Sequence, residues 1–89
     1  MSEAAVIAAI AAELKVAPGE LRPEAEFDKD YGIDSLDFVR LVMAVEVAAC
    51  VRIDDKAAAK ARSVGELLEL ARSSPPGPPT GSTRPAAGR

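Results

Sequence analysis

Residues 30–46 read DYGIDSLDFVRLVMAVE, and this stretch predicts where the longest helix of the chain begins. Asp34 is a strong helix N-cap, and Asp37 follows three positions later, where a carboxylate suits the positive end of the helix dipole. With Asp34 as the cap, Ser35 becomes the first helical residue, and its hydroxyl has no structural role. A phosphate attached to that hydroxyl would meet the free amides of the helix N-terminus.

The same residues also have a plainer interpretation. Asp-Ser-Leu is short and common, so taken alone it indicates only a capped helix. Asp34 and Asp37 would repel a phosphate on Ser35, and they make more sense as contacts for a modifying enzyme or its metal. The residues by themselves therefore leave a capped helix and a modification site both open.

The helix should run from residue 34 or 35 to about residue 49, because this segment contains no Gly or Pro. Successive side chains turn by about 100° around the axis, which divides them between two sides. A helix that is apolar on both sides can be packed on both, so burial of the outer side is the alternative. We expect a core side with Phe38, Leu41, Val42, Val45 and Ala49, and an exposed side with Leu36, Arg40, Met43 and Val47.

The N-terminal segment predicts a first helix over residues 3–15, with Ser2 as its N-cap. A long connection follows, which Pro18, Pro23 and Gly32 interrupt. A structureless loop of this length is unusual in a compact domain and is often functional. The apolar residues of the first helix that share one face are Val6, Ile7, Ile10 and Leu14.

Two more helices complete the predicted domain. A short third helix over residues 56–61 has Asp54 or Asp55 as its cap, and a fourth over 64–72 opens on a capping box, a serine with a glutamate three positions later. The predicted fold class is therefore all-α, a four-helix bundle with a long loop between helices 1 and 2 and a short third helix.

The domain should cover residues 1–72, and residues 73–89 should form a disordered Pro/Gly-rich tail or linker. The tail holds five of the seven prolines and no large apolar side chain. Such a segment buries too little surface to offset the entropy lost on ordering.

The composition excludes several functions. The chain has no histidine, which excludes a Ser-His-Asp triad, a Cys-His dyad and a histidine zinc site. Cys50 is the single cysteine, and we expect a small buried thiol.

Residues 1–72 carry 9 Lys or Arg and 14 Asp or Glu, a balance of -5 that disfavours nucleic acid and favours basic protein partners. With no targeting or membrane-spanning segment visible, we expect a cytoplasmic monomer that binds neither membrane nor nucleic acid.

With the surrounding residues included, the central stretch resembles the attachment motif of acyl carrier proteins, which residues 32–36 match as Gly-Ile-Asp-Ser-Leu. Residues 41–46 resemble the body of that family's second helix, and residues 51–55 resemble its exit, where an isoleucine enters the core. Phe27 and the Ser63-Val64 pair also fit, so the similarity covers roughly residues 3–72.

This resemblance implies a carrier rather than an enzyme. A phosphopantetheinyl transferase would attach 4'-phosphopantetheine to Ser35, between Asp34 and Leu36. The arm would hold an acyl group as a thioester and present it to acyl-loading, ketosynthase or other thioester-using enzymes. Such tethering replaces free diffusion by a high effective concentration.

The family's docking surface, transferred to this sequence, would comprise Leu36, Asp37, Arg40, Met43, Glu46 and Val47. Here the chain departs from the family pattern. Arg40 stands where an acid is common, and Val47 and Ala48 occupy positions where further acids are usual. The departure argues against a housekeeping fatty-acid carrier and favours polyketide or other specialised biosynthesis.

Two alternatives stay open. An aminoacyl or peptidyl carrier of a nonribosomal peptide pathway would use the same arm, although such carriers more often have Gly-Gly before the residue that precedes the serine. The second alternative is an unmodified helical interaction module that binds a partner helix through Leu36 and Met43.

Overall fold

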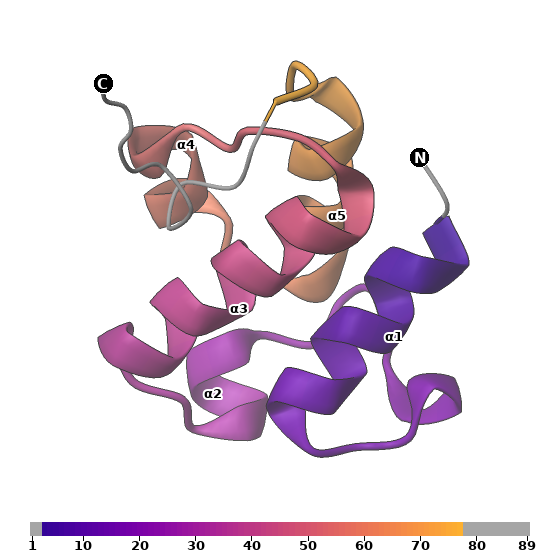
Figure 1. The fold of residues 1–89 in the computed structure, drawn as a ribbon. Helices are drawn as coiled ribbons and strands as arrows, with labels where there is room; N and C mark the ends of the chain where they lie inside the picture. The colour runs from indigo at the N-terminus through magenta and orange to yellow at the C-terminus, as the bar shows by residue number, and fades with distance from the viewer. Residues whose placement is uncertain (1–2, 78–89) are drawn as a thin grey trace.

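A computed structural model describes residues 3–77, and the predicted all-α fold class is confirmed (Figure 1). Ser2, the predicted first N-cap, lies outside the described residues. The three later predicted helices begin and end within one residue of their expected bounds. The elements in chain order are α1 (Glu3–Leu14), the 3-10 turn η1 (Pro18–Glu20), α2 (Phe27–Tyr31), α3 (Ser35–Ala49), α4 (Asp55–Lys60) and α5 (Val64–Ser73).

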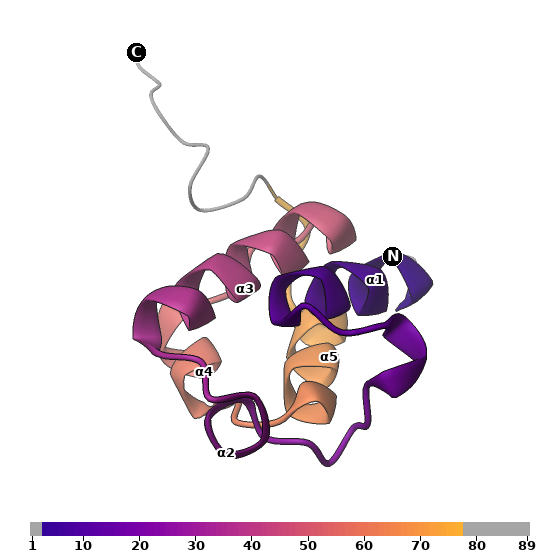
Figure 2. The ribbon, with the colours of Figure 1, turned by 90° about the horizontal axis from the view of Figure 1, so that it is seen from below.

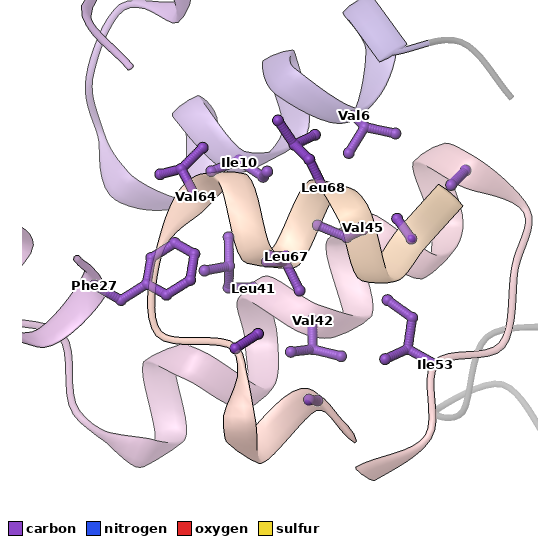
Figure 3. Packing of buried hydrophobic residues seen from close by; sticks show 14 of the residues in the cluster. Val6, Ile10, Phe27, Leu41, Val42, Val45, Ile53, Val64, Leu67 and Leu68 are labelled. Atoms are coloured by element: carbon purple, nitrogen blue, oxygen red, sulfur yellow. The ribbon is translucent and has the colours of Figure 1, made fainter. Parts of the chain in front are cut away.

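The helices enclose one apolar core. α1 packs along α3, α5 contacts both of them, and α4 packs against α5 (Figure 2). Core residues from α1, α3 and α5 point toward one another, and Ile53 enters from the loop before α4 (Figure 3). The largest apolar side chains with no more than 1% exposure are Val6, Ile10, Leu41, Val45, Ile53 and Leu67. Full burial of one such side chain contributes about 1.5–3 kcal/mol.

The two predicted core faces agree with the structure, with three residues only partly buried. On α3, Phe38 is partly exposed, and its ring centroid lies 5.5 Å from that of Phe27. On α1, Ile7 and Leu14 pack at the edge of the core.

The connection between α1 and α3 contains more structure than the sequence predicts. Glu20 Oε1 accepts a hydrogen bond from the Ala17 amide at 3.0 Å and closes η1. α2 begins at the buried Phe27 and ends at Gly32, whose φ of 62° lies in the left-handed region that glycine adopts without strain. The predicted long connection is present, and the two short elements within it were not predicted because single helical turns are too short to give a periodic pattern.

Side-chain caps fix the starts of α4 and α5 as predicted. Asp54 Oδ2 accepts from the Ala57 amide at 3.0 Å. At α5, Ser63 Oγ accepts from the Glu66 amide at 3.2 Å, while Glu66 Oε1 accepts from the Ser63 amide at 3.1 Å. The Arg62 and Ser63 amides, which donate to this carboxylate, hold the pKa of Glu66 below its ordinary value.

The structure continues past residue 72, where the predicted domain ends. Ser73 belongs to α5, and the residues after it bind the loop that follows α3. The Arg52 amide donates to the Pro75 carbonyl at 2.9 Å, and the Gly77 amide donates to the Cys50 carbonyl at 3.3 Å. Backbone groups of a segment without a core side chain thus pair with the domain, a contact that composition does not reveal. The rest of the predicted tail, residues 78–89, lies outside the described part.

Cys50 differs from its prediction. The sequence predicts a buried thiol, but Cys50 is exposed. It caps the end of α3 in the left-handed conformation, with φ at 56°, and its amide donates to the Glu46 carbonyl. The change of chain direction at this cap turns the side chain away from the core.

We expect the domain to need residues 74–77 but not residues 78–89. A chain that ends at Gly77 should keep the melting temperature of the full chain. A chain that ends at Ser73 should melt roughly 4–8 °C lower if the lost hydrogen bonds contribute about 1 kcal/mol. A chain that ends at Ser74 keeps the bond from Ser74 Oγ to the Leu70 carbonyl, at 2.7 Å, and should fall between them. Equal melting temperatures for all these chains would show that this contact adds no stability.

Candidate functional site

The site is organised around the first turn of α3. Asp34 caps the helix, and its Oδ1 accepts from the Asp37 amide at 2.8 Å. Ser35 is consequently the first helical residue, as the sequence predicts, and it is exposed. Among residues 3–77 its hydroxyl has no hydrogen-bond partner. The hydroxyl is therefore sterically accessible and is not needed to hold the fold together.

Two open hollows flank this serine, between the first half of α3 and α4. One has a volume of about 360 Å³ and the other about 300 Å³, and Ser35, Phe38 and Ala59 line both. Figure 1 shows the start of α3 beside α2. The other lining residues of the first hollow are Phe27, Asp28, Ile33, Asp34, Ala61 and Arg62, and those of the second are Val39, Val42, Asp55 and Ala58.

Most residues that line these hollows are apolar, and the charged ones are Asp28, Asp34, Asp55 and Arg62. An extended group attached to Ser35 would find apolar surface on both sides of its attachment point. A larger hollow of about 460 Å³ lies between the loop before α4 and the end of α5, and Ser35 does not line it. Although it is larger than the other two, this hollow is therefore not part of the serine site. Within residues 3–77, no group of three or more Cys, Asp or Glu side chains could hold a metal ion.

The outer side of α3 is exposed, as the helical phase predicts. Leu36 and Val47 each keep 61% of their surface exposed, and Met43 keeps 36%. The alternative that these residues are buried is therefore wrong. Asp37 and Arg40 are exposed beside them.

Sequence reasoning missed Val39, which is 52% exposed and continues the apolar stripe of Leu36, Met43 and Val47. The exposure of Val39 could have been predicted from its position around the helix axis. Val39 lies about 60° from Leu36 around the axis, on the same side of the helix. A β-branched apolar residue, however, is more often assigned to a core.

Glu46, assigned to the docking surface from the family resemblance, is not on that surface. Its side chain is fully buried, and its Oε2 accepts a hydrogen bond from the Ile53 amide at 2.8 Å. The position follows from the helical repeat, because Glu46 comes four residues after the buried Val42. Glu46 thus holds the loop that inserts Ile53 into the core.

Loss of the Glu46 carboxylate should destabilise the fold. Glu46→Ala leaves the Ile53 amide without this acceptor, which should lower the free energy of unfolding by about 1–3 kcal/mol in urea titration. Glu46→Gln retains an acceptor and should lose less. Glu13→Ala is the matched control, since Glu13 is exposed on α1 and should change stability by less than about 0.5 kcal/mol. If Glu46→Ala were as mild as Glu13→Ala, the buried hydrogen bond would contribute nothing.

Comparison with known proteins identifies the class to which this arrangement belongs. The family described as "Phosphopantetheine attachment site" matches residues 4–71, which include all of α3 and α4 and all of α1 except its first residue. The chain therefore belongs to the phosphopantetheine-attachment family, whose members are carriers without catalytic activity of their own.

Two relatives within the family define the class of this protein more narrowly. The chain is 47% identical over 62 residues to the acyl carrier protein of Helicobacter pylori strain G27, which covers 70% of this chain and 80% of the relative. The acyl carrier protein of strain J99 is 45% identical over the same coverage. The acyl-carrier resemblance seen in the sequence is confirmed, and the protein is a phosphopantetheine-bearing acyl carrier.

The chemistry of such a carrier comes from its prosthetic group, whose terminal thiol forms the thioester with the acyl cargo. The residues around Ser35 fit this group, since they combine a free hydroxyl with apolar hollows on both sides. Family membership also implies modification by a phosphopantetheinyl transferase and interaction with acyl-using enzymes.

None of the described helices is both long and apolar enough to cross a membrane.

Proposed function

We propose that this protein carries acyl intermediates as thioesters on 4'-phosphopantetheine bound to Ser35, and that it serves polyketide or other specialised biosynthesis in the cytoplasm. The observation that carries the site assignment is the free hydroxyl of Ser35 at the start of α3. The charge and burial pattern on α3 supports the pathway.

A comparison of the described serines supports Ser35. Ser63 Oγ accepts from the Glu66 amide, and the hydroxyls of Ser73 and Ser74 donate to carbonyls in the last turns of α5. Each of these three hydroxyls stabilises a helix end. Ser35 is the described serine whose hydroxyl has no such role, and it lies beside hollows that can receive the arm.

Modification should depend on Ser35 alone. Treatment with a broad-specificity transferase and coenzyme A should raise the intact mass by one phosphopantetheinyl group, and Ser35→Ala should abolish the increase. Ser73→Ala is the control, because Ser73 is an exposed serine in the last turn of α5 and should be modified like the wild type. An alanine variant at position 35 that still gains the full mass would refute the assignment.

The pathway proposal rests on the outer side of α3. This side presents an apolar stripe, Leu36, Val39, Met43 and Val47, with Arg40 beside it. The burial of Glu46 removes one of the acids that a basic partner could contact. We propose that Leu36, Asp37, Arg40, Met43 and Val47 contact acyl-using enzymes, and that Arg40 favours partners with an acidic group opposite it.

Reversal of the charge at Arg40 should shift partner choice. Arg40→Glu should increase, several-fold at low salt, the turnover of the modified protein by a fatty-acid ketosynthase with a basic docking patch. The gain should shrink as salt screens the charges. Arg22→Glu makes the same charge change at an exposed residue before α2 and should have little effect. Equal turnover for wild type and Arg40→Glu, at unchanged helicity, would show that Arg40 does not face the partner.

A further inference from the structure

The hollow that contains Ser35 has an uneven set of charges. Asp28, on α2, and Asp34, the cap of α3, supply two carboxylates, and Asp37 is exposed one turn further on. Arg62 is the one cation that lines this hollow, and it belongs to the segment between α4 and α5. A phosphodiester on Ser35 would add negative charge beside these carboxylates, so its position depends on where it finds positive charge.

The backbone of Arg62 is held firmly in this place. Its amide donates to Glu66 Oε1 at 2.8 Å, and its carbonyl accepts from the Phe27 amide at 2.9 Å. These two hydrogen bonds hold the Arg62 backbone against the start of α2 and the N-terminal cap of α5. The guanidinium group is exposed, and among residues 3–77 it forms no ion pair within 4.0 Å.

Arg62 also borders a second hollow, which Glu24, Glu26 and Glu66 line. The side chain thus stands between two groups of acids and forms no ion pair within 4.0 Å with either, although its charge helps to lower the pKa of Glu66. A guanidinium group presents several N–H donors in one plane and binds phosphate oxygens with two parallel hydrogen bonds. A tethered phosphodiester offers such oxygens at high local concentration, whereas these exposed carboxylates hold the side chain only loosely.

We infer that Arg62 is a positioning residue for the prosthetic group: its guanidinium binds the phosphodiester on Ser35 and directs the arm along the hollow between α3 and α4. The inference rests on the proposed modification of Ser35. Arg62 neutralises the added charge and draws the phosphodiester away from Asp34 and Asp37. The first part of the arm then lies against Phe38 and Ala59, which line both hollows.

The test compares the full chain before and after modification. Phosphorus NMR of the modified wild type should show a shifted and broadened phosphodiester resonance, which moves toward that of the same modified chain unfolded in urea as salt is raised. Modification should also raise the urea midpoint. Arg62→Gln should lose both effects, and Arg62→Lys should keep part of each because it retains the charge. Arg52→Gln is the matched control, since Arg52 is exposed, forms no ion pair among the described residues and does not line the Ser35 hollow.

The outcomes separate this inference from the function it rests on. A wild-type chain that takes up no phosphopantetheine overturns both. A modified wild type whose phosphorus resonance and stability match those of modified Arg62→Gln overturns the role of Arg62 alone. If Arg62→Gln resists modification, the side-chain Nε–H NMR resonance of Arg62 in the wild type tests the contact instead. It should shift when the arm is added, and an unchanged resonance refutes the contact.

Discussion

The hydrogen bond between the Asp34 carboxylate and the Asp37 amide determines where α3 begins, and much of the structure depends on that start. Each helical residue turns by about 100°, so one fixed end sets the direction of every later side chain. The start at Ser35 places Leu41, Val42 and Val45 in the core and the stripe from Leu36 to Val47 outside. It also leaves the Ser35 hydroxyl in the first turn, where no intrahelical bond needs it.

The second requirement is the position of α4, which forms the far wall of both hollows beside Ser35. α4 is short and makes few contacts, so the loop before it must be held by other groups. Glu46 binds the Ile53 amide from inside the domain, and Pro75 binds the Arg52 amide from outside. Between them Ile53 fills the core, and Asp54 then starts α4. The buried carboxylate is thus a structural residue whose effect reaches the functional site through the loop.

Much of this could be predicted from the sequence, because the strongest signals are local. Caps such as Asp34 and Ser63, and the periodicity of a fifteen-residue helix, depend only on neighbouring residues. Two of the errors have a common physical origin. The exposure of Cys50 and the pairing of Pro75 depend on how the chain turns after α3, and short segments carry no periodic signal for such turns. The helical phase alone could have warned that Glu46 follows Val42 by one turn.

The hollows themselves could not be predicted from the sequence, because they are formed by segments far apart in the chain. Arg62 and Asp28 are separated by 34 positions, yet both line the hollow of Ser35. The hydrogen bond between the Phe27 amide and the Arg62 carbonyl brings these segments together, and neither group's participation depends on its side chain.

The arrangement also separates two electrostatic tasks around one serine. The acids at the start of α3 lie next to Ser35, where we propose that the transferase acts, whereas Arg40 lies a turn further along, where we propose that downstream enzymes dock. Exposed charges interact over about 10 Å at ordinary salt, and one helical turn rises about 5.4 Å, so the two groups of charges are separated in place but are not independent. Arg40 therefore weakens the negative field that Asp37 contributes beside Ser35. A change of charge at Arg40 should for that reason alter both the outer side of α3 and the surroundings of Ser35.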